Sequence, residues 1–398
     1  PLIITIGKIK VEKFFLIISI CSIIMFSPSL SKLFRTPVVV VEISLGLLAG
    51  YFGLIYADAT LILIAKFGFV YLMFLAGLEI NLKLVKIIKA TLALNVIMYF
   101  VFLYSISGLI CWLFDLSITY FVALPIFSLG MLMMLIKEYG KDEPWLNLAL
   151  SIGVVGEVVS ILALTLFSGW VEHGFNLSFF VSILTIIAVV LLIILSLRLF
   201  YIIFWWYPEL KKFLVPDADN NRFDQDIRFS ISSLLILVAI MYALKIDVVL
   251  GAFAAGLFFK MFFYQKHDLI EKIESFGFGF FVPIFFIYTG STVKLEMLTY
   301  DIFKHALFIM TAIIIIRLIS SYLAFYKYLK FKQTMLFALS DSMPLTFLVA
   351  IAMLTYNYGL ISQAEYFSFI IASMIDGLIL MLLIRKLHKT FCLTTSNK

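Results

Sequence analysis

Long apolar stretches dominate this sequence, and their length constrains its fold more than any other feature. A helix that crosses a bilayer needs about 20 largely apolar residues. Backbone polar groups in lipid must also be satisfied within the protein, which favours helices. Thirteen stretches meet or approach this length, at residues 14–30, 37–56, 61–78, 91–114, 119–136, 146–170, 178–206, 227–243, 247–263, 277–290, 303–328, 333–354 and 364–385. The sequence therefore predicts an all-α polytopic membrane protein with about thirteen transmembrane helices, the first and tenth of them short.

The composition supports a membrane protein and argues against several other classes. Hydrophobic residues make up 64% of the 398 residues and charged residues 14%, whereas soluble domains carry about 25% charged residues. The longest polar interval, 207–228, has only the length of a loop, so we predict a single membrane domain over residues 1–398. The cysteines lie far apart and the histidines fall in loops or at segment ends, so no metal, haem or other cofactor is expected. The net charge of +6 fits lysines on a cytoplasmic face and does not indicate nucleic-acid binding.

Basic residues are distributed unevenly between the two sets of connecting loops. The loops after the odd-numbered spans and the C-terminal tail hold most of the lysines and arginines, whereas the N-terminal segment and the loops after the even-numbered spans hold few. Cytoplasmic loops of membrane proteins are rich in these residues. We therefore expect the N-terminus outside and the C-terminus in the cytoplasm of a bacterial inner membrane.

Two of the spans contain residues that break helices, and they occupy matching places in the chain. The span at 119–136 contains Pro125 and Gly130 around Ser128, and the span at 333–354 contains Ser340 to Pro344. With thirteen spans, helices 4–6 and helices 11–13 run in opposite directions, which is the topology of an inverted repeat. Transporters with such repeats bind their substrate near the bilayer midplane, between broken helices.

Four ionisable residues fall well inside predicted spans, where a charge costs roughly 2.5–3.5 kcal/mol on insertion scales. They are Glu157, Arg317, Asp341 and Asp376. A buried carboxylate can bind either a proton or a cation such as Na⁺ or K⁺, so that the two compete for one group. Glu157 is the best candidate for this ion-binding role. The structural alternative is a buried pair in which Arg317 neutralises Glu157 or Asp341 and ties helices together.

Several further residues are candidates for supporting roles. Ser128 and Ser342 would place hydroxyl groups at the two breaks as possible cation ligands. Arg317 and Asp341 would supply fixed charge and balance the exposed helix ends. Asp376, Glu42 and Glu79 are weaker candidates, and the last two are expected to be interfacial or structural because they lie near helix ends.

Four short strings, in order along the chain, resemble the monovalent cation:proton antiporter family 2, which includes bacterial Na⁺/H⁺ exchangers and the membrane part of Kef-type K⁺ efflux systems. They are Arg35-Thr36-Pro37 with Glu42 and Gly46-Leu47-Leu48-Ala49-Gly50; Phe74-Leu75-Ala76-Gly77-Leu78-Glu79; Gly251-Ala252-Phe253-Ala254-Ala255-Gly256-Leu257; and Phe281-Val282-Pro283-Ile284-Phe285-Phe286 with Gly290. The resemblance covers nearly the whole chain.

The resemblance implies an NhaA-like inverted-repeat fold with crossed, broken helices 5 and 12, and a homodimer with a role in pH homeostasis. It implies core helices near 91–170 and 303–388, and dimerisation or scaffold helices near 14–78 and 178–290, which move against each other to give alternating access. The family's ion-binding carboxylate often follows Asp, Asn or Gln, whereas this chain has Gly156-Glu157. One carboxylate without an acidic neighbour fits electroneutral exchange of one cation for one proton.

Two other functions remain open at this stage, besides antiport of Na⁺, Li⁺ or K⁺ against H⁺. The first is a gated K⁺ efflux pathway of the Kef type. The lack of a G-x-G-x-x-G segment after the last span argues against this function. The second is a member that has lost exchange, which the Gly156-Glu157 departure permits. An intramembrane enzyme is not expected, because the sequence has no H-E-x-x-H, G-x-S-x-G or G-x-G-D motif.

Overall fold

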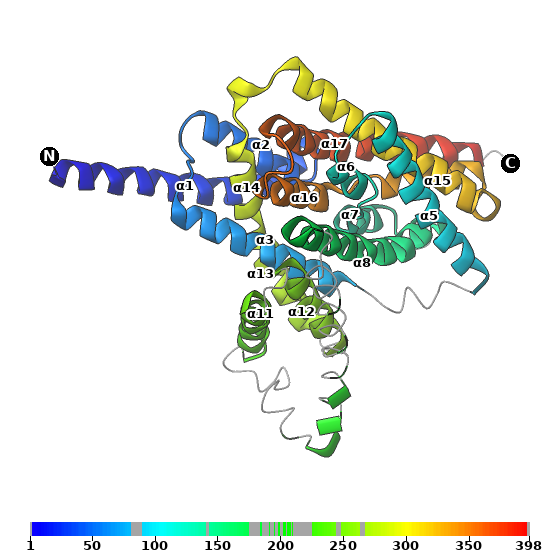
Figure 1. Ribbon diagram of the computed structural model, residues 1–398, viewed down its shortest axis with the longest axis horizontal. Coiled ribbons are helices and arrows are strands. Elements are labelled where there is room, and N and C mark those ends of the chain that lie inside the picture. Colours follow the sequence, from blue (N-terminus) through cyan, green and yellow to red (C-terminus); the bar gives the residue numbers. More distant parts are fainter. Residues whose placement is uncertain are drawn as a thin grey trace. The chain divides into compact units, whose positions relative to one another are not determined.

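The computed structural model describes residues 2–80, 90–140, 143–174, 225–243, 248–262 and 267–395, and scattered residues between 184 and 209. Its regular secondary structure is helical throughout these residues (Figure 1), which confirms the predicted all-α fold. Seven of the described helical stretches are long and apolar enough to cross a membrane: Lys13–Phe34, Ala59–Glu79, Leu92–Leu113, Pro144–Phe167, Leu269–Thr292, Tyr300–Asp341 and Gln363–Phe391. Most of the span predicted at 178–206 and most of the loop at 207–228 lie outside the described residues.

The helices form two compact units. The first contains residues 1–58, 82–160 and 286–398, and the second contains residues 59–81 and 161–285. The division into core and scaffold helices made from the sequence stays a prediction.

The first unit holds both broken helices. Its elements are α1 (Leu2–Phe34), α2 (Val38–Tyr51), α5 (Ala90–Leu113), α6 (Ile118–Ala123), α7 (Leu129–Tyr139), α8 (Pro144–His173) up to Ser160, α14 (Val282–Thr292) from Phe286, α15 (Tyr300–Asp341), α16 (Leu345–Asn357) and α17 (Gln363–Thr395). Helix α15 packs along α17 and α5, and α16 packs on α17 (Figure 1). Within α15, Lys330 has φ 60° and ψ 166°, so the predicted helices 11 and 12 meet there.

The second unit contains α3 (Ala59–Glu79), α11 (Gln225–Ala243), α12 (Val248–Phe262), α13 (His267–Phe276) and the π-helix η2 (Gly277–Phe281). The short tenth span predicted at 277–290 is wrong in length, because α13, η2 and α14 form an unbroken helical run from His267 to Thr292. Because α13 contains charged residues, a prediction based on apolar length alone did not include it in the span. Within the run, the Val282 amide donates to the Gly277 carbonyl. This wider π-type turn directly precedes Pro283.

Helices α3 and α12 touch through their main chains. A Cβ atom placed on Gly77 would lie 2.2 Å from the Phe253 carbonyl oxygen, and one placed on Gly256 would lie 2.0 Å from the Phe74 carbonyl oxygen. Small residues allow this close approach between membrane helices, whose association depends on packing because lipid gives little hydrophobic driving force. Two of the family-like strings thus contain their glycines for a packing reason.

We expect Gly256→Ala to destabilise the protein by about 1–3 kcal/mol, because the added methyl group overpacks a contact in which only main-chain atoms could move aside. The midpoint of thermal unfolding in detergent would measure the effect. Gly279→Ala is the matched control: Gly279 also lies in a helical segment, but a Cβ there would meet nothing within 4 Å. Equal melting of the two variants would contradict the close approach of α3 and α12.

The same kind of contact joins α2 and α14 in the first unit. Cβ atoms placed on Gly46 and Gly290 would lie 2.2 Å from the Ile287 carbonyl oxygen and 2.1 Å from the Ile43 carbonyl oxygen. Gly50 approaches Ser291 in the same way, at 2.7 Å from its carbonyl oxygen. Three glycines spaced along one interface therefore hold these helices at main-chain contact.

Candidate functional site

The first break separates α6, which ends at Ala123, from α7, which begins at Leu129. Pro125 has no N–H group, so it leaves the carbonyl of Phe121, four residues earlier, without its helical donor. The Ser107 hydroxyl of α5 donates to that carbonyl oxygen, at 3.3 Å. The Phe127 amide, inside the break, donates to the Ser160 hydroxyl of α8, at 2.9 Å. Neighbouring helices thus satisfy backbone groups that lipid could not.

The second break lies between the end of α15 at Asp341 and the start of α16 at Leu345. Pro344 directly precedes α16 and cannot continue the helical hydrogen bonds of α15. The Ser342 hydroxyl donates to the Ala338 carbonyl of its own helix, at 2.7 Å, where it closes the last turn of α15. The structure confirms that helices 5 and 12 are both broken, as the sequence predicts.

Arg317 bonds to both breaks at once. Its Nε donates to the Asp341 carbonyl oxygen at 2.8 Å, its Nη1 donates to the Leu124 carbonyl oxygen at 2.7 Å, and its Nη2 donates to the Ile126 carbonyl oxygen. The side chain is fully buried. The carbonyl ends of α6 and α15 each carry about half a negative charge, so one guanidinium compensates two helix ends. Among the described residues Arg317 forms no ion pair with a carboxylate, so the helices are tied together through carbonyl groups and not through the charge pair that the sequence offered as an alternative.

The opposite, amide ends of the two following helices also meet. The Ser128 hydroxyl, directly before α7, lies 2.6 Å from the Thr346 hydroxyl in the first turn of α16. Neither of the residues that directly precede these helices, Ser128 and Pro344, forms a side-chain cap hydrogen bond. Two helix ends that attract negative charge are therefore linked by a pair of hydroxyl groups. The oxygen atoms of these hydroxyl groups are also potential cation ligands.

Glu157 lies on α8, the helix that covers the first break. Three residues of α8 make this contact: Gly153 faces Leu129 and Leu132, Gly156 faces the Phe127 ring, and Ser160 accepts from the Phe127 amide. At 3.6 residues per turn, Glu157 lies about 40° from Gly153 and about 60° from Ser160 around the helix axis. It thus shares the helix face that packs on the break. Its side chain is 1% exposed, near the middle of the membrane-length stretch Pro144–Phe167.

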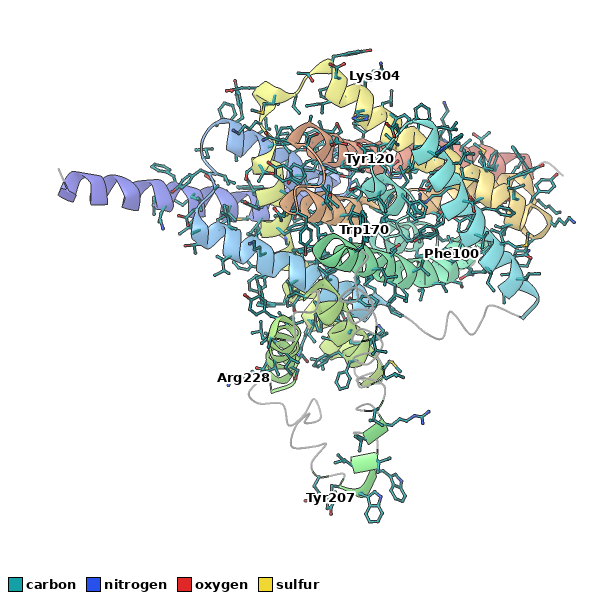
Figure 2. All side chains as sticks on the ribbon, viewed as in Figure 1. Phe100, Tyr120, Trp170, Tyr207, Arg228 and Lys304 are labelled. Carbon is teal, nitrogen blue, oxygen red and sulfur yellow. The ribbon has the colours of Figure 1, made fainter. Side chains whose placement is uncertain are left out.

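Gly156 has a steric role next to Glu157. A Cβ atom on Gly156 would lie 2.4 Å from the Phe127 ring, so the side chain of an Asp, Asn or Gln at this position would not fit here without movement of that ring. The Phe127 ring also packs against Phe100 of α5 (labelled in Figure 2), with centroids 5.5 Å apart, and lies 5.2 Å from the Arg317 guanidinium carbon. The aromatic ring fills the space that a second polar ligand would need.

Asp341 is held by a tyrosine from α5. The Tyr99 hydroxyl donates to Asp341 Oδ2 at 2.6 Å, and both side chains are buried. The other carboxylate oxygen, Oδ1, has no hydrogen-bond partner among the described residues. The end of α15 therefore places a carboxylate beside the backbone carbonyl that Arg317 binds.

We expect Tyr99→Phe to destabilise the protein by about 1–3 kcal/mol, because it leaves a buried carboxylate oxygen without its donor. Thermal unfolding in detergent is the measurement. Tyr104→Phe, one and a half turns along α5, is the control and should melt close to wild type, because the Tyr104 hydroxyl donates to neither carboxylate oxygen of Asp341. A Tyr99→Phe variant as stable as the control would show that the bond to Asp341 contributes nothing.

The remaining candidates form none of the hydrogen bonds given above for the two breaks. Asp376 is buried in α17, and Glu42 is buried in α2 with the Ser27 hydroxyl of α1 3.4 Å from its Oε1. Glu79 is the last residue of α3, in the second unit. Tyr120 of α6 (labelled in Figure 2) donates to Glu365 of α17 at 3.2 Å, which connects the first half of the broken helix to α17.

Sequence reasoning missed Tyr99 and Thr346. Tyr99 is one tyrosine in a long apolar helix, and nothing local distinguishes it from packing residues. Thr346 lies two residues after Pro344, so a polar residue close to a predicted break was the available signal. Arg317 was found, but the sequence could not reveal that its partners are main-chain carbonyls.

Comparison with known proteins supports one family. Residues 16–386 match the model of the family described as sodium/hydrogen exchanger, transmembrane. The Na⁺/H⁺ antiporter of Enterococcus hirae is 26% identical over 305 residues, which are 74% of this chain and 76% of that protein. YjbQ of Bacillus subtilis (strain 168) is 27% identical over 286 residues, which are 66% of this chain. The match covers only 44% of YjbQ, so this chain spans less than half of it.

A solved structure shares the fold. The sodium proton antiporter MjNhaP1 from Methanocaldococcus jannaschii superposes with a TM-score of 0.66, covering 94% of this chain and 97% of that chain at 13% sequence identity. The helical arrangement is thus one that a protein with few identical residues also adopts.

Proposed function

Because this chain belongs to the sodium/hydrogen exchanger family, we propose that it exchanges a monovalent cation, Na⁺ in the first place, for protons across a membrane, with Glu157 as the group that binds either ion. The observation that carries the proposal is the burial of Glu157 on the face of α8 that packs against a broken helix. A carboxylate there can hold a proton or coordinate a cation, and the two compete for the same oxygen atoms. Such competition couples the two fluxes without further machinery.

The residues around the breaks have supporting roles in this proposal. Arg317 holds the two breaks together and compensates their carbonyl ends, and Asp341 adds a second carboxylate beside it. The hydroxyl groups of Ser128 and Thr346 are candidate oxygen ligands. The Ser342 hydroxyl is committed to the Ala338 carbonyl, which favours a structural role over cation binding.

One cation for one proton is the stoichiometry that this site favours. Gly156 contributes no side chain, and the space next to it is filled by the Phe127 ring, so Glu157 has no acidic neighbour in sequence with which to bind a second exchanged proton. We further propose an inverted repeat, alternating access through motion of the helices around the breaks, a homodimer in a bacterial inner membrane, and an N-terminus outside. The matched breaks joined by Arg317 support the repeat.

Proton flux in proteoliposomes tests the function. The purified protein is reconstituted with a pH-sensitive dye inside, and Na⁺, Li⁺, K⁺ or choline is added outside as the chloride salt. Because an entering cation is exchanged for a proton that leaves, we expect alkalinisation of the lumen that depends on an alkali cation and not on choline, without a current that a potential-sensitive dye detects. Absence of cation-dependent flux would refute antiport, a K⁺ response alone would favour the efflux alternative, and a large current would refute one-for-one exchange.

A further inference from the structure

Asp376 is a buried carboxyl group that the proposed exchange does not use. It lies on α17, is 1% exposed, and neither of its carboxylate oxygens has a hydrogen-bond partner among the described residues. The next residue, Gly377, packs against Leu345, the first residue of α16: a Cβ there would lie 2.8 Å from Leu345 Cδ1. Asp376 therefore lies in the part of α17 that borders the second helix break.

Three helices, α2, α15 and α16, pack most extensively against α17. The buried charged residues of these helices are Arg317 and Asp341 of α15 and Glu42 of α2, and α16 has no charged residue from Leu345 to Asn357. Arg317 is the cation that acts electrostatically on Asp376. Asp341 has the Tyr99 hydroxyl as a donor, and Glu42 has the Ser27 hydroxyl. Asp376 differs from both in having no such donor among the described residues.

A count of charges shows why one carboxyl in this region must hold a proton. The carbonyl ends of α6 and α15 offset Arg317, and the amide ends of α7 and α16 add about one positive charge between them. One ionised carboxylate then balances the region, and a bound monovalent cation allows a second. Glu157, Asp341 and Asp376 provide three carboxyl groups, so at least one of them stays protonated, because an unbalanced buried charge is unfavourable. The carboxyl without a hydrogen-bond donor is the one least able to ionise.

We propose that Asp376 is a second proton-binding site of the transport core: it holds a proton while the core exchanges ions, and loss of that proton at alkaline pH stops exchange. Ionised Asp376 would add an uncompensated negative charge next to the breaks, which would hold the cation and slow its release. The part of the proposal that concerns exchange rests on the proposed antiport, whereas the protonation of Asp376 does not.

Infrared difference spectroscopy tests the protonation directly. Spectra of the purified wild-type protein are recorded between neutral and alkaline pH, and we expect loss of a carboxylic-acid C=O band on alkalinisation. That band should be absent from Asp376→Asn and shifted in frequency in Asp376→Glu. An identical band in the wild type and Asp376→Asn would overturn the proposal, whether or not the protein transports ions.

The pH profile of Na⁺-dependent proton flux tests the consequence. Because the carboxyl is protonated at low pH and ionised at high pH, the wild-type rate should fall on the alkaline side. In Asp376→Asn the decline in rate should occur at a pH higher by about one unit or more, a tenfold change in proton concentration, since the amide cannot ionise. The rate of Asp376→Glu should still fall at alkaline pH, but at a shifted pH value. This variant also tests the inference if Asp376→Asn folds poorly. Overlapping wild-type and Asp376→Asn profiles would overturn the inference and leave the antiport intact, whereas absent wild-type flux would refute the antiport.

Discussion

Glu157→Gln is expected to lower cation-dependent proton flux by about 100-fold or more, because a side chain that takes up and releases the proton contributes about 10²–10⁴-fold to the step it serves. Glutamine keeps the shape of the side chain but carries no charge and binds no proton at working pH, so it removes both competing states together. Flux in proteoliposomes with Na⁺, Li⁺ and K⁺ added in turn is the measurement.

Two further variants test whether the effect is specific to the carboxylate of Glu157. Glu157→Asp keeps a carboxylate on a shorter arm, so we expect a reduced rate with residual cation dependence. Glu138→Gln is the control for loss of a carboxylate elsewhere: Glu138 pairs with Arg385 near the surface, with distances of 2.8 and 3.0 Å, and should transport close to wild type. A Glu157→Gln variant that responds to cations as the wild type does would remove Glu157 from the mechanism.

Arg317→Met is expected to destabilise the protein by about 3–5 kcal/mol, because three buried carbonyl groups at two helix breaks lose their donor together. Methionine fills much of the volume, so the effect isolates the guanidinium and its hydrogen bonds. The midpoint of thermal unfolding in detergent measures stability, and flux should be lost with it because the breaks are no longer held next to each other.

Arg317→Lys and Arg385→Met show whether the geometry matters. A lysine ammonium is a compact charge and cannot reproduce the planar fork that reaches three carbonyl oxygens, so Arg317→Lys should melt between wild type and Arg317→Met. Arg385 forms a partly exposed ion pair with Glu138, which is worth less than about 1 kcal/mol, and Arg385→Met should melt near wild type. If Arg317→Met melted like Arg385→Met, Arg317 would not bridge the breaks.

The sequence was sufficient for the features that depend on local chemistry. Apolar length predicted the helices, and Pro125 and Pro344 predicted both breaks, because proline removes a backbone donor wherever it lies. The cost of a charge in lipid singled out Glu157, Arg317, Asp341 and Asp376 as buried groups, and the structure buries all four.

The sequence was insufficient where distant segments meet. The bond from Tyr99 to Asp341 joins residues 242 positions apart, and those from Arg317 to Leu124 and Ile126 span 193 and 191 positions. Nothing local to these residues specifies such partners. The predicted start of one helix was wrong for another reason. Helix α13 has charged residues on one face, so apolar length alone placed the start of that helix ten residues late.

The three glycine contacts between α2 and α14 also limit how this protein can change shape. Sliding one helix along the other by a single residue would bring a side chain, in place of Gly46, Gly50 or Gly290, against a carbonyl oxygen about 2 Å away, and main-chain atoms at such a contact do not yield easily. The pair is locked in register and can travel only as one rigid body. Conformational change during a transport cycle must then take place at other helix pairs, and a disulfide engineered between α2 and α14 should leave turnover unimpaired.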